Sequence, residues 1–359
     1  MQSIKTMILF VVLLSVIVVI HEFGHLIVAK FFGVYCQEFS VGMGPKLWSK
    51  KGKETEYCIR AIPFGGFVAM AGDSDNSLET SVDTSEIPVE RTLPGVAPWK
   101  RIAIMLAGIF MNCILALLIM SLIFLHTGAY AVSPDATIAA VSPGSPAEKA
   151  GLLAGDRIVK AELENGTSAS PKTFNELSIF LDTYDGTGKF YFEVDRNGEI
   201  LHISVMPEYN EEYDRYLIGI SSGQYKTVEV NLGNCVYYAF DYLAMMFSLI
   251  VSSLLGLLRG VGLNNLSGPV GVYSTTAQAV SLGAVYYFEL MALISLNIGI
   301  FNALPLPILD GGRVLLTLIE MIIGHPISQK VQNIIMTISV AIVIGLFLLA
   351  TTQDILRLF

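Results

Sequence analysis

Long apolar runs dominate the chain, and shorter stretches of mixed polarity separate them. The first run, residues 7–30, is about as long as a helix needs to be to cross a ~30 Å hydrocarbon core. The run at 99–127 opens with Trp99-Lys100-Arg101, which suits a membrane interface. Further apolar runs cover residues 234–260, 284–309 and 333–352. This pattern predicts a helical membrane protein with several spans.

Between 128 and 207 the pattern changes to short alternating runs, such as 190–194 and 201–205. Alternation with period two is typical of half-buried strands, and the turn signals Asp185-Gly186 and Asn197-Gly198 separate the runs. One helix is expected at 171–182. This part of the chain is predicted to be a small β-rich soluble domain.

The segment between the first two spans is mixed. Residues 33–60 are rich in Gly and Lys and predict a loop. Residues 57–70 predict short strands, broken at Pro63 and Gly65-Gly66 into a hairpin. The acidic stretch 72–97 has few apolar residues and predicts a solvated linker.

Composition supports a membrane protein and narrows the partners. The chain is 53% hydrophobic and 15% charged, whereas soluble proteins have about 25% charged residues. Its net charge of −9 comes mostly from residues 130–232, so nucleic acid is not an expected partner. The four cysteines form no CxxC pair, which argues against a disulfide framework or a zinc ribbon.

Basic residues predict the orientation of the spans. Lysines follow the first span, Lys100 and Arg101 precede the second, and residues 102–148 contain no Lys or Arg. The 31–98 loop is therefore expected to be cytoplasmic and the β-rich domain extracytoplasmic. If 284–309 runs in the same direction as the first span, the segment at 234–260 cannot cross. We expect it to lie along the membrane as an interfacial helix. The prediction is four transmembrane helices with both termini outside.

The first span carries His21-Glu22-Phe23-Gly24-His25, an HExxH motif. His21 and His25 would lie one turn apart on the same helix face, within reach of one zinc ion. Glu22 beside them is placed to act as a general base. The alternative is a buried helix with two hydrogen-bonded histidines, but ionisable groups inside a span are costly and usually functional.

A catalytic zinc usually takes three protein ligands, and the candidate for the third is Asp310. It ends an apolar span that Pro305 and Pro307 interrupt, and Gly311-Gly312 follows. Irregular backbone at membrane depth is tolerated where it is buried or lines a wet cavity. The alternative for Asp310 is a carboxylate that caps the next helix. Asn112 in the second span has two open interpretations, an interhelical hydrogen bond or an active-site role.

Together these predictions divide the chain into seven segments. These are residues 1–30 (transmembrane helix 1), 31–98 (cytoplasmic loop with a membrane-associated hairpin and an acidic linker), 99–127 (transmembrane helix 2), 128–207 (β-rich domain), 208–283 (region with the interfacial helix), 284–323 (transmembrane helix 3 with an unwound segment) and 331–352 (transmembrane helix 4).

These motifs resemble those of the site-2 protease family of intramembrane zinc metalloproteases. HEFGH at 21–25 and NALPLPILDGG at 302–312 carry the resemblance. Residues 141–159 look like the core of a PDZ domain. Residues 62–73 resemble the membrane-associated β-hairpin of bacterial members, and 263–272 resemble the regulator-of-sigma-E protease branch.

The resemblance implies one zinc ion per chain, held by His21, His25 and Asp310, with Glu22 as catalytic base. It also implies that Asn302, with Pro305 and Pro307, helps to hold the substrate strand. An exposed hairpin edge around Ile59–Met70, with Gly65, Gly66 and Phe67 as the candidate residues, is expected to hold the same strand by strand addition. The expected fold is a polytopic α-helical membrane protein with four transmembrane helices, a membrane-associated β-hairpin and an inserted β-rich PDZ domain. Bacterial members often have Pro where Ile109 stands here, and the enterobacterial form has two PDZ domains where this chain has room for one.

The expected function is hydrolysis of peptide bonds in single-pass membrane proteins, such as a trimmed anti-sigma factor or a signal-peptide remnant, in a bacterial cytoplasmic membrane. The PDZ domain would accept a peptide C-terminus or exclude bulk. One alternative is a catalytically silent scaffold that binds clients through the PDZ domain. Another is a zinc hydrolase of lipids or prenylated peptides.

Overall fold

The computed structural model describes residues 2–73, 87–184, 186–211, 213, 215–258 and 267–356. The chain divides into two compact units, Met1–Ile123 with Leu266–Phe359, and Phe124–Asn265. Half of the acidic linker expected at 72–97 and part of the motif at 263–272 lie outside the described residues.

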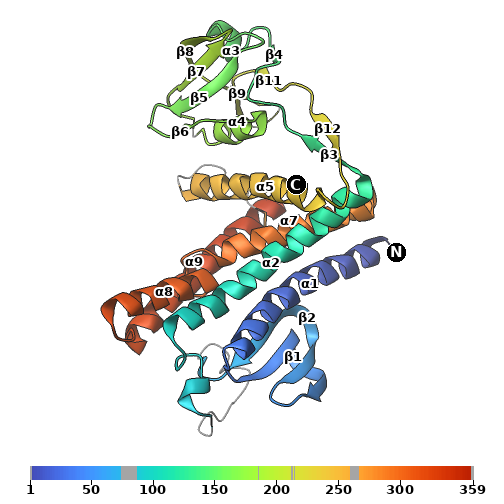
Figure 1. Cartoon of the computed structure of the whole chain (residues 1–359), viewed down its shortest axis with the longest axis vertical. Coiled ribbons are helices and arrows are strands. Elements are labelled where there is room, and N and C mark those ends of the chain that lie inside the picture. The colour runs from blue at the N-terminus through green and yellow to red at the C-terminus, as the bar shows by residue number, and fades with distance from the viewer. Residues whose placement is uncertain are drawn as a thin grey trace. The chain divides into compact units, whose positions relative to one another are not determined.

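Helices make up most of the first unit (Figure 1). They are α1 (Gln2–Phe31), α2 (Pro98–Thr127, whose last turn enters the second unit), α6 (Pro269–Leu282), α7 (Ala284–Asn302), α8 (Asp310–Ile323) and α9 (Gln329–Leu356), with a short 3-10 helix η3 (Val89–Arg91) before α2.

Five helices among the described residues are long and apolar enough to cross a membrane. They are α1, α2, α7 and α9 of this unit and α5 (Cys235–Leu258) of the second. A helix satisfies its own backbone hydrogen bonds, which lipid cannot do. The prediction of a helical membrane protein with β-rich sheets is confirmed.

One stripe of α1 faces the protein interior. Leu13 and Ile17 are fully buried, and His21 follows one turn later at 7% exposure. Ile8 and Val12 on the same helix are 57% and 43% exposed. In a membrane helix an exposed apolar face suits lipid, so the buried stripe carries the first histidine into the protein.

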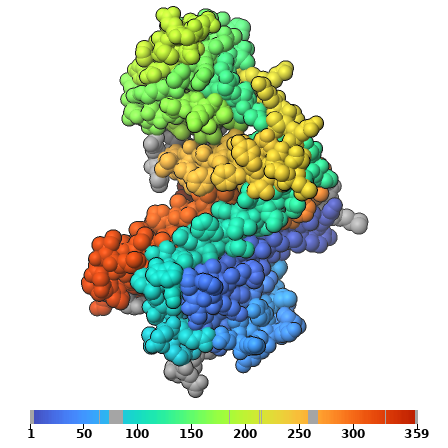
Figure 2. Space-filling model, viewed as in Figure 1, coloured from blue at the N-terminus to red at the C-terminus, as the bar shows by residue number. Residues whose placement is uncertain are grey.

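Strands β1 (Cys36–Lys51) and β2 (Glu56–Met70) form a two-stranded sheet against α1 (Figure 1). In Figure 2 the lighter blue residues of this segment lie beside the dark blue residues of α1. Both strands bend, so Glu38 lies opposite Ala69 in one half of β2 and opposite Glu56 in the other. The first part of β1 therefore lies between the two halves of β2. Residues 66–70 of β2 form one edge of this arrangement.

The prediction of a loop at 33–60 and a hairpin inside 57–70 was wrong. Residues 36–51 are a strand, the turn lies between Lys51 and Glu56, and β2 continues through Pro63. A proline is tolerated there because the register of the pairs shifts between Ile62 and Gly66. The Pro63 carbonyl accepts a hydrogen bond from Ser15 Oγ of α1 at 2.6 Å instead of from a neighbouring strand.

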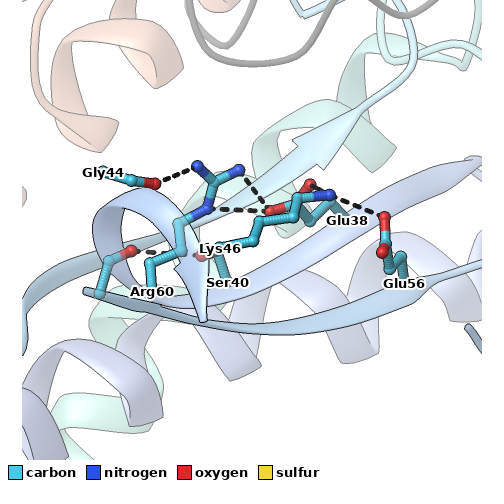
Figure 3. A network of polar contacts seen from close by, with 7 residues as sticks. Glu38, Ser40, Gly44, Lys46, Glu56 and Arg60 are labelled. Carbon is cyan, nitrogen blue, oxygen red and sulfur yellow. Dashed lines mark hydrogen bonds and ion pairs between the residues drawn. The ribbon is translucent and has the colours of Figure 1, made fainter. Parts of the chain in front are cut away.

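A network of charged residues centred on the buried Glu38 links the strands of the bent sheet (Figure 3). Glu38, 1% exposed, accepts from Arg60 Nη2 at 2.7 Å and from Lys46 Nζ at 2.8 Å. Lys46 also pairs with Glu56 at 2.8 Å, and Arg60 donates to the Gly44 carbonyl. Both cations and both carboxylates are thus paired, which buried charges require.

The second unit contains the other strands and α5. Its elements are β3 (Ala129–Val132), β4 (Ala140–Val141), α3 (Pro146–Lys149), β5 (Arg157–Leu163), β6 (Ser168–Ala169), α4 (Phe174–Leu181), β7 (Phe190–Arg196), β8 (Glu199–Val205), β9 (Glu208–Asn210), β10 (Arg215–Leu217), β11 (Ile220–Ser221), β12 (Lys226–Glu229) and α5.

The main sheet of this unit has the order β6-β5-β7-β8. Phe190, Phe192 and Val194 alternate inward from β7 and are buried against Leu177 of α4. Strands β7 and β8 are joined at the predicted Asn197-Gly198 turn, where both residues have positive φ. The alternation and the turn in this region are therefore as the sequence predicted.

The β-rich part extends beyond residue 207, where the sequence analysis ended it. Strand β11 pairs with β4, and β12 pairs with β3. These strands have two and four residues, too few for period-two alternation to stand out in an acidic, tyrosine-rich segment.

Candidate active site

Helix α1 presents the HExxH motif toward the interior of the first unit. His21 and His25 are 7% and 5% exposed, and their Nε2 atoms lie 3.2 Å apart. The i, i+4 spacing produces this geometry because it places the two rings on one face of the helix. Ligand atoms of Glu22 and both histidines all lie within 4.8 Å of one another.

Asp310 reaches the same point from a distant part of the chain. Its Oδ2 lies 3.0 Å from Nε2 of His21 and 3.4 Å from Nε2 of His25. Asp310 is the first residue of α8, after a non-helical break at 303–309. The break begins where α7 ends before Pro305 and Pro307, whose rings cannot continue the helix.

Two glycines make the turn into α8 tight. A Cβ on Gly311 would collide with the carbonyl of Ala303, and one on Gly312 with the carbonyl of Leu306. Only residues without a side chain allow the backbone to fold back this closely. The Gly311-Gly312 pair therefore fixes how closely the first turn of α8, and with it Asp310, packs against residues 303–307.

These three side chains fit a zinc ion. Ligand atoms about 2.0–2.1 Å from a tetrahedral zinc lie about 3.3 Å apart, and the three distances here are 3.0, 3.2 and 3.4 Å. Oδ2 of Asp310 is buried and has no hydrogen-bond partner among the described residues. A carboxylate oxygen and two imidazole nitrogens converging on one point form a donor set that zinc prefers.

Helix α2 closes the site from the other side. Nδ1 of His25 lies 2.8 Å from the carbonyl of Ile104, and Nδ1 of His21 lies 3.3 Å from the amide nitrogen of Asn112. Gly108 lies between Ile104 and Asn112 on α2, and a Cβ on it would be only 2.6 Å from Nε2 of His25. The sequence analysis singled out Asn112 but not Ile104 or Gly108.

A cavity of about 260 Å³ adjoins the three side chains and Glu22. Of the six residues expected to hold a substrate strand, Gly66, Phe67 and Asn302 line it, and Gly65, Pro305 and Pro307 are not among its lining residues. Pro307 is buried in the turn before α8. The two prolines thus act on the backbone around the site rather than on the cavity surface.

Two charged lining residues, Asp73 and Arg313, were missed by the sequence analysis. Arg313 Nη1 lies 3.2 Å from Oδ2 of Asp73, and both residues line the cavity. Arg313 follows the Asp-Gly-Gly motif by one position, so it is one turn from Asp310 on α8. The three-residue spacing from Asp310 was the feature of the sequence that could have indicated Arg313.

The sheet edge lies beside Glu22. A Cβ on Gly66 would be 3.7 Å from Cγ of Glu22 and 2.7 Å from the carbonyl of Ser40. Residues 66–70 pair with 36–41 on one side, and Gly66, Phe67, Val68 and Met70 line the cavity. The absence of a side chain at Gly66 allows the strand backbone to approach the carboxylate.

Comparison with known proteins supplies independent findings. The family model described as peptidase family M50 matches residues 9–346. A Clostridium perfringens protein named as a candidate zinc metalloprotease is 34% identical over 95% of this chain and 96% of its own. Regulator of sigma-W protease RasP of Bacillus subtilis is 30% identical over 99% of both chains. Zinc metalloprotease RasP of Shouchella clausii is 31% identical over 99% of this chain and 100% of its own.

Proposed function

The chain belongs to peptidase family M50 and is an intramembrane zinc metalloprotease, and on that premise we propose which residues carry the reaction. His21, His25 and Asp310 would hold one zinc ion. Glu22 is the general base. The observation that carries this proposal is the convergence of Asp310 on both histidines, at 3.0 and 3.4 Å, across 285 positions of sequence.

The zinc ion and the side chains of the protein contribute different steps to peptide hydrolysis. When bound, zinc supplies Lewis acidity, which activates water near neutral pH and polarises a peptide carbonyl. Glu22 takes the proton from the attacking water and returns a proton to the leaving amine as the C–N bond breaks. The two histidines and Asp310 stay deprotonated at their ligand atoms. The small cavity beside Glu22 would admit water to the buried histidines and Asp310.

Membrane proteins are the substrate class of this protease, and we propose single-pass proteins in particular. A transmembrane helix hides its carbonyls in its own hydrogen bonds, so it must unwind before cleavage. The unwound strand would pair with the edge of β2 at Gly65, Gly66 and Phe67 by strand addition. Asn302, which also lines the cavity, would bind the backbone of that strand, while Pro305 and Pro307 keep residues 303–309 non-helical. The position of Gly66 beside Glu22 supports this arrangement.

We also propose four membrane crossings, by α1, α2, α7 and α9, with α5 along the membrane surface. Asp241 of α5 accepts a hydrogen bond from Tyr130 at 2.9 Å, and Tyr237 and Phe240 are exposed. A carboxylate within the helix and a row of aromatic side chains suit an interface better than a lipid core. Residues 31–98 would then be cytoplasmic and the second unit extracytoplasmic, in a bacterial cytoplasmic membrane.

The exposed apolar residues of the sheet support membrane association of the hairpin. Met43, Leu47, Trp48, Ile59 and Ile62 are between 42% and 70% exposed. Such a patch on an otherwise charged hairpin marks a membrane or protein contact. We propose that it dips into the cytoplasmic leaflet, which would bring the sheet edge to substrate depth.

We propose that the second unit contains a PDZ domain over most of its strands. It would inspect the extracytoplasmic end of the substrate, by binding a new C-terminus or by excluding bulk. A trimmed anti-sigma factor or a signal-peptide remnant would fit, and the printed name of the B. subtilis relative, a regulator of sigma-W protease, favours the former.

The direct test is Glu22→Gln in the full chain, reconstituted with a single-pass substrate. Loss of cleavage with unchanged zinc content and unchanged substrate binding is expected, because Gln cannot accept the proton. Glu199→Gln, an exposed strand position, is the matched control and should cleave normally. Cleavage by Glu22→Gln at the wild-type rate would refute the assignment. A wild-type chain that binds the substrate without cutting it would favour a scaffold.

A further inference from the structure

We infer that Asn112 is a positioning residue for His21: its side-chain oxygen accepts the Nδ1 hydrogen and leaves Nε2 free to bind the zinc. This inference rests on the proposed function of the site. If Asn112 has this role, one face of α2 orients both metal-binding histidines. Ile104, Gly108 and Asn112, spaced four residues apart, meet His25 and His21 in order.

His25 provides the reference geometry. Its Nδ1 lies 2.8 Å from the main-chain carbonyl of Ile104. A carbonyl oxygen can only accept, so the hydrogen must be on Nδ1 of His25. The other nitrogen, Nε2, then points its lone pair toward Asp310 at 3.4 Å. Fixing the tautomer through the distal nitrogen is how metal-binding histidines are commonly oriented.

Among the described residues no main-chain carbonyl bonds Nδ1 of His21, and the side chain of Asn112 lies there instead. The side-chain amide nitrogen of Asn112 lies 3.3 Å from Nδ1 of His21, and its Oδ1 is buried with no partner among the described residues. The two ends of an amide are distinguished only by their hydrogen bonds. If the nitrogen faced His21, Nδ1 would accept and Nε2 would carry the hydrogen.

That tautomer is incompatible with the site, because the hydrogen would point at Asp310 and at Nε2 of His25, where the cation belongs. A rotation of the amide by 180° places Oδ1 against His21. Nδ1 then donates, and Nε2 presents a lone pair. In either orientation of the Asn112 amide, one end lacks a partner among the described residues. The orientation is therefore decided by the hydrogen bond to His21 alone.

Asn112 is held firmly enough to do this. It is fully buried, and its main-chain oxygen accepts a hydrogen bond from Ser295 Oγ of α7 at 2.9 Å. A Cβ on Gly299 would be 3.5 Å from Cβ of Asn112, so α7 packs directly against it. The bond to α7 uses the backbone and would form with any residue at 112. The side-chain amide is therefore needed for His21 rather than for helix packing.

The test is zinc affinity, measured by competition with a chelator on the full-length protein in detergent. Asn112→Leu keeps the size of the side chain but removes the acceptor, and should weaken zinc binding by about 10–100-fold. Asn112→Asp keeps an acceptor and cannot donate when ionised, and should bind zinc at least as tightly as the wild type. Ser121→Ala, a polar position of α2 whose hydroxyl bonds only its own helix at Leu117, is the control.

Wild-type affinity in Asn112→Leu would overturn the inference, as would an Asn112→Asp affinity as low as that of the Leu variant. If the Leu variant does not fold, the Asp variant still decides, because a needed amide donor would be lost in it. The outcome is separable from that of the proposed function. A wild-type chain that binds no zinc contradicts the metal centre itself, whereas tight zinc binding in both wild type and Asn112→Leu contradicts only the role of Asn112.

Discussion

Gly108 is the position where one added methyl group should remove the zinc site. A Cβ there would lie 2.6 Å from Nε2 of His25 and 2.7 Å from Cε1 of His21. Ordinary contacts between such atoms are about 3.5–4.0 Å, so Gly108→Ala must displace the rings or α2 by about 1 Å.

The backbone of α2 has little room to retreat. A Cβ on Gly24 of α1 would already lie 2.5 Å from the carbonyl of Ala107, so the two helices cross in close contact. The rings must therefore move. A misplacement of about 1 Å costs about 100-fold in function at a site of this kind, or about 2.8 kcal/mol. We expect zinc affinity to fall by at least that factor.

The assay is zinc retained against a chelator, with thermal unfolding measured in parallel. Ala is favoured over Gly in a helix by about 1 kcal/mol, so loss of zinc should not come from a weakened helix. Gly345→Ala on α9 is the matched control, since a Cβ there meets nothing within 4 Å. Wild-type zinc affinity in Gly108→Ala would refute the geometry of the site.

Three further predictions concern the parts that support the site. Arg60→Met removes one of the two cations that pair with the buried Glu38 carboxylate and leaves Lys46, so it should destabilise the hairpin by less than the ~3–5 kcal/mol of a buried charge left unpaired. Protection of the hairpin from proteolysis measures this, and undiminished protection would contradict the stabilising role of the network. Burial alone would raise the pKa of Asp156, but hydrogen bonds from Arg196 and the Leu153 backbone N–H hold that pKa below its ordinary value. The ion pair of Asp156 and Arg196 should therefore stabilise the second unit above about pH 4, and this stabilisation should be lost as the pH falls through the lowered pKa. The free energy of unfolding is measured against pH for the wild type and for Asp156→Asn. The same pH slope in both proteins would contradict the prediction. Asp354→Ala removes the carboxylate that accepts from the first turn of α6 and should lower the unfolding free energy by about 1 kcal/mol; an unchanged midpoint would contradict the cap.

Local features of the site could be predicted from the sequence because their geometry is set by one helix. The i, i+4 spacing of His21 and His25 guarantees a shared face once α1 forms, and the apolar run guarantees the helix. Asp310 is 289 positions away from His21, so its place beside the histidines could be predicted only from the span direction and the family resemblance. The structure has these three side chains together.

Contacts that depend on packing between helices could not be predicted. Nothing in the local sequence of α2 indicates that the Ile104 carbonyl meets His25, or that Gly108 leaves room for both rings. Strand β1 was missed for a related reason. Its pairing with both halves of β2 is non-local, and a run rich in Gly and Lys reads as a loop when taken alone.

The most direct test of the account is zinc stoichiometry in the purified full chain, compared with His21→Ala and Asp310→Asn. We predict about one zinc per wild-type chain and loss or sharp weakening of binding in both variants, because each removes one of three ligands. Zinc that depends on His21 but survives Asp310→Asn with unchanged affinity would contradict the claim that α1 and α8 share one metal ion.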